Sequence, residues 1–225
     1  MKLRPVVIVG SAAVIGMLIL SAWAWPQIPD GAQVPIHWGI DGTPDGYGPK
    51  WLGLLGIPIL TVLVVALLLV IPRFEPRRAN LERSATAYVA VGIAVTLFVT
   101  ALHVAAVLAA LGENVNLGMV ASIGIGLAFV VMGNYLGKTR SNWFFGIRTP
   151  WTLSSDRSWT RTHRLGGVAF VVIGLLVIVT ALVAGPSVAI WVLLGGMAAS
   201  VIGLLAYSYL VWRDDPDRQP ARTTG

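Results

Sequence analysis

The sequence predicts an all-α polytopic membrane protein, a bundle of six transmembrane helices, and two observations support this. Hydrophobic residues make up 56% of the chain and charged residues only 12%, which leaves too little polar surface to cover a soluble globule. The apolar residues also stand in long blocks, each of the length that a helix needs to cross a hydrocarbon core about 30 Å thick. Separately, the absence of cysteine excludes disulfides and thiolate-ligated metal sites.

Six apolar stretches follow one another along the chain. They are Pro5–Trp25, Leu52–Pro72, Ala85–Leu111, Leu117–Gly137, Leu165–Gly185 and Val188–Trp212. Continuous helices are expected, because lipid cannot satisfy exposed backbone groups. The first stretch, which follows Lys2 and Arg4 and ends near an Ala-Trp-Ala sequence, also resembles a cleaved signal peptide. It is longer than the usual apolar region of about 7 to 15 residues, so we favour a retained span.

The basic residues predict the orientation of the bundle. Fifteen of the sixteen Lys and Arg residues lie before the first span or after the second, fourth and sixth spans, and only Lys50 lies on the opposite side. Both termini are therefore expected in the cytoplasm. The net charge of +6 then reflects topology and contact with membrane lipids, and we expect no direct binding of nucleic acid.

The predicted spans suggest three parts. Residues 1–72 form a two-helix unit with an extracellular loop at 26–51, residues 73–212 form a four-helix unit with a cytoplasmic loop at 138–164, and residues 213–225 form a cytoplasmic tail that we expect to be disordered. The proline and glycine content of the extracellular loop predicts a short, turn-rich cap. Within it, alternating Val34, Ile36 and Trp38 predict a short edge strand with one face on the bundle or membrane.

A metal site in the cap is a weak prediction. The segment from Asp41 to Gly46 resembles the first half of a calcium loop, but Leu52 stands where a bidentate Glu is needed. His37 with Asp41 and Asp45 could hold another divalent ion. Turn formation by Asp and Gly explains the same residues, and we expect no resident metal or other cofactor.

Few polar residues lie inside the spans. No Asp, Glu, Lys or Arg falls at the centre of a span, which argues against a proton-coupled pump. His103 is the intramembrane exception, and either a functional role or a hydrogen bond to a neighbouring helix could explain it. Small residues predict close helix packing at two places: Gly133 with Gly137, and Gly195 with Ala199 and Gly203. We expect packing within the bundle, with a homodimer as the alternative.

The cytoplasmic loop concentrates six basic residues and three Trp. Its first part, 142–151, is aromatic and contains helix-breaking Gly and Pro. Ser154 or Ser155 can then cap a helix that begins near Asp156. Arg157, Arg161 and Arg164 form one stripe of that helix, while Trp159 and His163 share another face. We expect an amphipathic interfacial helix on the inner leaflet, serving either as a lipid anchor or as a docking surface.

These same residues resemble a known family. The stretches GNYLGK from Gly133, NWFFGIRTPWTL from Asn142 and WTRTHR from Trp159 are similar to the signature of the SdpI family of bacterial membrane proteins. The outer segment QVPIHWGIDGTPDGYGPK resembles a small domain of unknown function that often precedes it. The resemblance implies a multi-pass protein of the bacterial cytoplasmic membrane.

The resemblance also implies immunity to, or sensing of, a secreted antimicrobial peptide toxin, with relay to a cytoplasmic transcriptional repressor. The ligand side would then be the extracellular cap, with His37, Trp38, Asp41, Asp45 and Tyr47. The cytoplasmic motif would comprise Asn134, Lys138, Gly146, Arg148, Thr149, Pro150, Trp151, Thr152, Trp159, His163 and Arg164.

Two other function classes stay open at this point. A transporter or lipid-handling protein would need a polar pathway at mid-membrane, which the sequence does not show. A membrane enzyme could use His37 or His163 with acidic partners. Because the chain has no HExxH motif, no nucleophile elbow and no paired-carboxylate site, we predict no catalytic residues.

Overall fold

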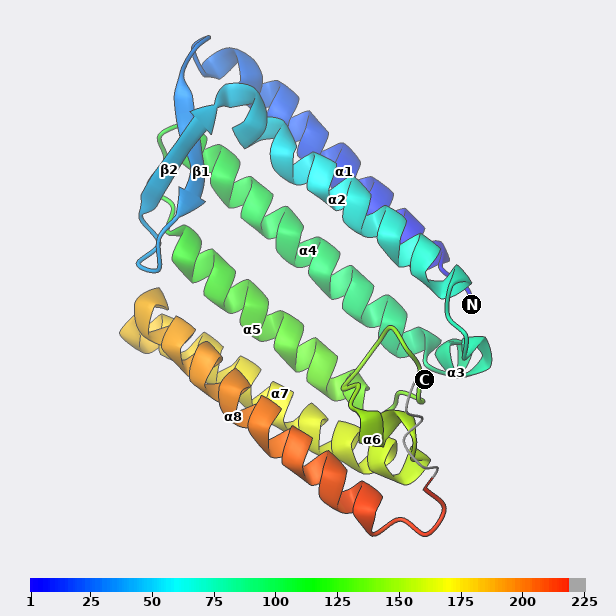
Figure 1. Cartoon of the computed structure of the whole chain (residues 1–225). Coiled ribbons are helices and arrows are strands. Elements are labelled where there is room, and N and C mark those ends of the chain that lie inside the picture. Colours follow the sequence, from blue (N-terminus) through cyan, green and yellow to red (C-terminus); the bar gives the residue numbers. More distant parts are fainter. Residues whose placement is uncertain (219–225) are drawn as a thin grey trace.

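Figure 1 shows the computed structural model of the chain, which describes residues 1–218. The long helices are α1 (Arg4–Ala24), α2 (Lys50–Val70), α4 (Ala85–Ala110), α5 (Leu117–Leu136), α7 (Asp156–Ala184) and α8 (Pro186–Arg213). Shorter elements connect them: the 3-10 turns η1 (Trp25–Gln27) and η2 (Ile71–Arg73), the strands β1 (Gln33–Trp38) and β2 (Pro44–Pro49), and the helices α3 (Arg78–Arg83) and α6 (Pro150–Leu153).

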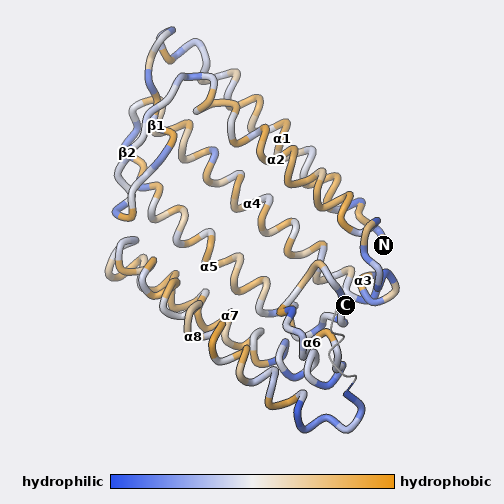
Figure 2. Tube along the Cα trace, in the orientation of Figure 1, coloured by the Kyte–Doolittle hydropathy of each residue, from blue (hydrophilic) through white to orange (hydrophobic). Residues whose placement is uncertain are grey.

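The prediction of six spans is confirmed. Six helices are long and apolar enough to cross a membrane, and most of their ends lie within two residues of the expected boundaries. Local signals set several of these ends. The Asn116 side chain accepts a hydrogen bond from the Met119 amide at the start of α5, and Gly185, with φ of 88°, is the single residue between α7 and α8. Figure 2 shows apolar residues along the helices and hydrophilic residues at their ends.

The helices form two groups of three. Helices α1, α2 and α4 pack on one another, while α5 and α8 both pack on α7. The two groups meet along α4 and α5, so the long helices follow one another across the view in Figure 1. Helix α4 therefore contacts helices on both sides of the boundary at residue 72, and the division into units 1–72 and 73–212 stays a prediction.

The two ends of the bundle differ in character. The strands lie at one end, and the N-terminus, α3, α6 and the end of α8 lie at the other (Figure 1); we call these the hairpin end and the terminal end. Among the described basic residues, Lys50 alone lies at the hairpin end. This charge distribution agrees with the positive-inside argument, and the cytoplasmic position of the terminal end stays a prediction.

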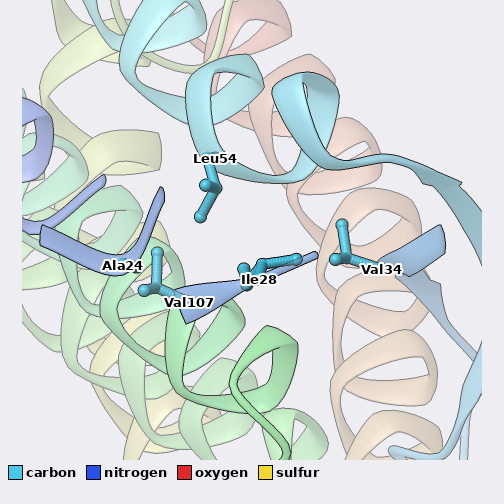
Figure 3. Close-up of a cluster of buried hydrophobic side chains, with 5 residues drawn as sticks. All are labelled: Ala24, Ile28, Val34, Leu54 and Val107. Carbon is cyan, nitrogen blue, oxygen red and sulfur yellow. The ribbon is translucent and has the colours of Figure 1, made fainter. Parts of the chain in front are cut away.

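The cap contains a small two-stranded sheet. Strands β1 and β2 pair antiparallel, with Val34 opposite Gly48 and irregular register near His37. The expected strand at Val34, Ile36 and Trp38 is present, and its partner β2 was not predicted. Val34 is buried with Ala24, Ile28, Leu54 and Val107, which joins the cap to α1, α2 and α4 (Figure 3). The sheet is therefore held against the first helix group.

Glycine allows α5 and α7 to approach closely. A methyl group at Gly133 would lie 2.5 Å from the carbonyl oxygen of Gly167, and one at Gly126 would lie 2.7 Å from that of Gly174. Both distances are far below van der Waals contact, so these positions require glycine. The expected close packing at Gly133 is confirmed, with α7 as the partner helix.

The expectation that the small-residue stripe of α8 packs within the bundle is wrong. Gly195, Ala199 and Gly203 are exposed, and a methyl group at Gly195 or Gly203 would meet nothing within 4 Å. Helix α8 packs on α7 through another face, which includes Gly196, so the small-residue stripe does not pack within the bundle. A homodimer through this stripe stays a prediction.

The prediction of a separate interfacial helix before the fifth span is also wrong. Ser155 does cap a helix that begins at Asp156, but that helix continues to Ala184 as α7. Gly166 and Gly167 do not break it; both are buried and pack against neighbouring side chains and backbone. The cationic stripe of Arg157, Arg161 and Arg164 therefore lies on the first turns of a transmembrane helix.

Candidate functional site

The loop between α5 and α7 is folded into a compact polar assembly at the terminal end. We call this assembly the hub: residues 138–155, the segment 75–84, the first turns of α7 and the last turns of α8. Many of its polar side chains are buried, including Asn142, Thr152, Ser158 and His163. Buried polar groups need hydrogen-bond partners, and the hub supplies them across segments that are far apart in sequence.

His163 and Trp159 form the centre of the hub. They lie one turn apart on the buried face of α7, and their rings stack with centroids 3.9 Å apart. His163 Nδ1 lies 2.8 Å from the Trp159 carbonyl oxygen, and the Ile147 amide lies 2.9 Å from Nε2. The carbonyl can only accept and the amide can only donate, so the imidazole is neutral with its proton on Nδ1.

Gly146 is required by this arrangement. Its φ is 115°, a conformation that favours glycine, and a methyl group there would lie 2.4 Å from His163 Nε2. Meanwhile the Trp159 indole donates to the Thr139 carbonyl at 3.0 Å. The loop is thus attached to one turn of α7 both at its start, at Thr139, and at its middle, at Ile147, which explains why Gly146, Trp159 and His163 occur together in the motif.

Thr149 and Thr152 start the short helix α6. The Thr149 hydroxyl accepts from the Thr152 amide and the Thr152 hydroxyl accepts from the Thr149 amide, a reciprocal capping box. Thr152 also donates to the Ile147 carbonyl at 2.8 Å. The Thr149 hydroxyl lies 3.2 Å from that of Ser208 on α8. Pro150 occupies the first turn, where its missing amide proton costs nothing.

The segment after α2 supports the other side of the loop. Buried Glu75 accepts from the Trp143 amide at 3.0 Å and from the Arg77 amide at 2.8 Å. Arg77 donates to the Leu153 carbonyl at 2.9 Å and to the Ser141 hydroxyl. Asn80 donates to the Ser141 carbonyl, also at 2.9 Å. These contacts attach the loop to the first helix group.

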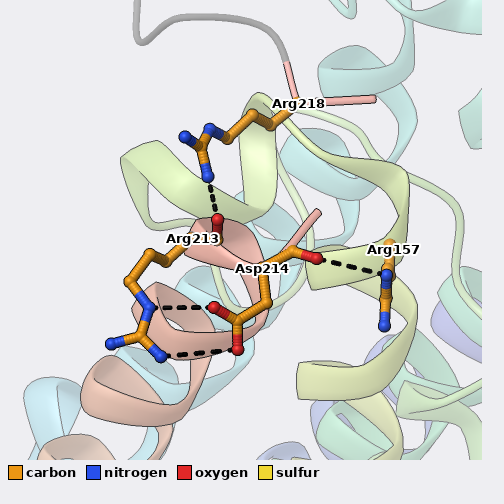
Figure 4. A network of polar contacts seen from close by, with 4 residues as sticks. All are labelled: Arg157, Arg213, Asp214 and Arg218. Carbon is orange, nitrogen blue, oxygen red and sulfur yellow. Dashed lines mark hydrogen bonds and ion pairs between the residues drawn. The ribbon is translucent and has the colours of Figure 1, made fainter. Parts of the chain in front are cut away.

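The end of α8 closes the hub. The Ser155 hydroxyl donates to the buried Asp215 carboxylate at 2.5 Å. Figure 4 shows the neighbouring network, in which Arg157 donates to the Asp214 carbonyl and Arg213 pairs with the Asp214 side chain. This corrects the expectation of a disordered tail for residues 213–218, while 219–225 lie outside the described residues.

Other residues of the cytoplasmic motif lie at the surface. Asn134, Lys138, Pro150 and Arg164 are exposed, as is Arg148, which donates to the Trp143 carbonyl. Trp151 is half-buried, and its ring meets that of Tyr209 edge to face at 5.2 Å. Arg157 and Arg161 are exposed as well. The motif therefore has a buried part that builds the hub and a basic surface part.

The cap residues are spread over the hairpin. His37, Asp41, Asp45 and Tyr47 are exposed and Trp38 is half-buried. His37 Nδ1 pairs with Asp45 at 2.5 Å, while Asp41 accepts from the Thr43 hydroxyl and amide. The hydrogen bond from the Thr43 hydroxyl lowers the pKa of Asp41, and that from its amide adds to the effect. In the described residues, no group of three His or carboxylate side chains is placed to hold a metal ion.

His103 lies in the interior of the first helix group. Its Nε2 is 3.1 Å from the Ser21 hydroxyl and 3.2 Å from the Met17 carbonyl, both on α1. Ser21 in turn donates to the Leu54 carbonyl on α2 at 2.6 Å. These contacts favour a proton on Nε2, and they connect α1, α2 and α4 at one point. They support the interpretation of His103 as a bonded, neutral imidazole.

An apolar pocket of about 510 Å³ lies beneath the hairpin. Its roof is the hairpin tip from Ile36 to Ile40, and its walls come from α2, α4, α5, α7 and α8. It therefore lies where the two helix groups separate. Ser122 on α5 and His37 at the rim contribute polar side chains, and most other lining residues are aliphatic.

Several hub residues could not be found from sequence. Glu75, Asn80 and Ser84 precede the first motif residue, Asn134, by 50 to 59 positions, and Ser208 and Asp215 follow the last, Arg164, by 44 and 51. No local pattern marks them, because their partners are set by the tertiary fold. Glu75 shares its connection with a second acidic residue, Glu82, so its charge alone does not mark it.

The fold and the hub define the class of protein. The chain is a polytopic membrane protein with six spans, a strand hairpin at one end and a buried polar hub at the other. Residues 138–208, which run from the hub loop through α7 into α8, match the model of the SdpI/YfhL protein family. Residues 12–62 match a model described only as a domain of unknown function, DUF1648.

A curated relative extends the similarity. The chain is 25% identical over 180 residues to the immunity protein SdpI of Bacillus subtilis (strain 168). The aligned residues cover 79% of this chain and 83% of that protein. No solved structure matches the chain. The resemblance to the SdpI family that the motifs indicated is confirmed.

Proposed function

We propose that this chain protects a bacterial cell against a secreted antimicrobial peptide, sensing it at the hairpin end and responding through the hub. The observation that carries the proposal is the overlap of the family match at 138–208 with the hub and the helices that build it. The name of the relative, an immunity protein, supports the activity. In this proposal the hairpin end faces outward and the terminal end faces the cytoplasm, as the basic residues indicate.

The contacts of the hub with both helix groups support a role in relaying a signal between the two ends of the bundle. Its loop is hydrogen-bonded to Glu75, Arg77 and Asn80 from the first helix group and to α7 and α8 from the second. A shift of one helix group against the other must break or exchange these bonds. The hub can therefore have two arrangements whose populations depend on a ligand that binds between the groups.

The exposed face of the hub is suited to a cytoplasmic partner. Arg148, Arg157, Arg161 and Arg164 are exposed, and guanidinium groups pair well with carboxylates. We propose that this face binds an acidic surface of a cytoplasmic repressor. The buried residues Gly146, Trp159 and His163 would act indirectly, by holding the loop in shape.

A protection assay tests the immunity proposal. Cells of Bacillus subtilis (strain 168) that lack the relative would express this chain or an empty vector, and both would be exposed to the peptide from which the relative protects. We expect survival with the chain and killing without it. Equal killing of both cultures, with the chain shown to be inserted in the membrane, would contradict protection against that peptide.

A transporter or lipid-handling role is the second candidate, and the pocket beneath the hairpin favours it. An enzymatic role has no comparable support. The two ring nitrogens of His163 are engaged by backbone groups, and His37 pairs with a single carboxylate at an exposed position. We therefore propose no catalytic residue.

A further inference from the structure

The pocket beneath the hairpin is lined by residues of both helix groups. Ile57 and Leu102 come from the first group, while Ala121, Val177 and Leu193 come from the second. Its volume of about 510 Å³ falls in the range of small-molecule binding sites, roughly 300 to 1,000 Å³. A cavity of this size lined mainly by aliphatic side chains suits an apolar ligand.

The depth of the pocket matches one leaflet of a bilayer. On α5 it extends from Leu117, the first helical residue, to Ile125, which is about 12 Å of helix. On α8 it extends from Pro186, also the first residue, to Leu193. One half of a hydrocarbon core about 30 Å thick is roughly 15 Å, so the pocket lies in the leaflet at the hairpin end.

Polarity changes along the pocket. The rim carries His37 and the backbone of the hairpin tip, Ser122 lies partway down α5, and Ile125 and Leu193 form the deep end. Ser122 is a hydroxyl side chain in the wall of the pocket, and a hydroxyl can donate a hydrogen bond to a ligand oxygen. A polar rim above an apolar interior suits a molecule with a polar end and a hydrocarbon tail.

We propose that this pocket binds the acyl chain of a lipid from the leaflet at the hairpin end. The chain would lie between Ile57, Leu102 and Leu193, with its carboxyl or ester oxygens near Ser122 and the rim. A bilayer phospholipid and a free fatty acid share this chemistry. A membrane-crossing peptide helix fits less well, because the pocket ends within one leaflet. This inference does not depend on the immunity proposal.

Photolabelling of retained lipid tests the inference. The full chain would be reconstituted in vesicles of phosphatidylethanolamine and phosphatidylglycerol that contain phosphatidylglycerol with a diazirine in the middle of one acyl chain. A parallel sample would contain a diazirine fatty acid instead. After detergent extraction and gel filtration to remove loosely held lipid, irradiation and peptide mass spectrometry would locate the label. We expect it on pocket residues such as Ser122, Ile125 and Leu193.

Matched variants distinguish lipid bound in the pocket from lipid on the outer surface of the bundle. Ala121→Phe fills the pocket and should abolish labelling there, whereas Ala199→Phe, on the exposed face of α8, should leave it unchanged. Leu193→Trp fills the pocket from the opposite wall and replaces Ala121→Phe if that variant fails to fold. Label in the pocket from either probe supports the inference and identifies the lipid class. Absence of pocket label from both probes, or undiminished label in the filled variants, would overturn it.

Discussion

At the scale of single residues, the contacts of His163 explain the positions of Gly146 and Trp159 in the cytoplasmic motif. Its two nitrogens join the Trp159 carbonyl to the Ile147 amide, and only a neutral imidazole can accept and donate in this way at once. Gly146 lies against the ring because no larger residue fits. These residues are structural members of the hub, and Arg148 next to them is exposed.

Gly146→Ala tests this interpretation against a matched glycine. Gly112 also has a positive φ, of 90°, but a methyl group there would meet nothing within 4 Å. Gly112→Ala should lower the free energy of unfolding by about 1–2 kcal/mol for the backbone conformation alone. Gly146→Ala should cost roughly 1–3 kcal/mol more, because the methyl group overlaps His163. Unfolding of both variants in detergent measures the difference, and equal losses would show that the His163 contact is unimportant.

Some of this site could be predicted from the sequence. The spacing of Trp159 and His163 placed them on one helix face, and the Ser155 cap was among the two serines expected. Their partners could not be predicted, because the Ile147 amide, the Thr139 carbonyl and Asp215 meet them only in the tertiary structure. The residues in the motif were found, but their division into buried and exposed sets was not.

At the scale of elements, the contact between α5 and α7 depends on glycine. Gly126 and Gly133 face Gly174 and Gly167, so the two backbones meet without intervening side chains. Helix association in lipid relies on such close packing, because burial of apolar surface contributes little there. This contact places the start of α7 beside the end of α5, where the hub forms.

Gly133→Ala should therefore destabilise the bundle. Its methyl group would press on the backbone of α7, at a cost of about 1–3 kcal/mol. Gly203→Ala on α8 is the control, since its methyl group meets nothing, and replacing a helical glycine by Ala favours the helix by roughly 0.5–1 kcal/mol. Thermal unfolding in detergent compares the two. A drop in midpoint for Gly203→Ala equal to that for Gly133→Ala would contradict the packing described.

The six spans were predicted more accurately than the segments that connect them. Long apolar blocks define the six spans almost without reference to the fold, because the bilayer sets the length required. The start of α7 was misjudged because an amphipathic pattern shows only that one face is apolar. It does not show whether that face meets lipid or protein, and here Trp159 and His163 meet the hub loop. Strand β2 was missed since Pro and Gly dominate it.

At the scale of the whole molecule, two helix groups are joined along α4 and α5 and are bridged at both ends. The hairpin tip lies over the pocket between them, and the hub attaches to both at the opposite end. A ligand that separated the groups beneath the hairpin would thus also strain the hub. This geometry is the physical basis that we propose for coupling between the hairpin end and the hub.

Cysteine labelling tests the orientation. The chain contains no cysteine, so single substitutions give an unambiguous signal. Thr43→Cys at the hairpin and Arg148→Cys in the hub replace exposed residues. In intact cells, a membrane-impermeant maleimide should modify position 43, and it should reach position 148 only after permeabilisation. The opposite pattern would place the hub outside the cell.

The central claim is that the hub presents a basic surface which the protective function requires. The most direct measurement is cell survival under the peptide, at equal membrane abundance, for wild type, Arg148→Ala and Arg73→Ala. Arg73 is exposed at the same end but lies outside the hub and outside the family match, so it controls for the loss of one charge. We predict that Arg148→Ala loses protection with a nearly unchanged unfolding midpoint, while Arg73→Ala protects normally. Full protection by Arg148→Ala would contradict the claim.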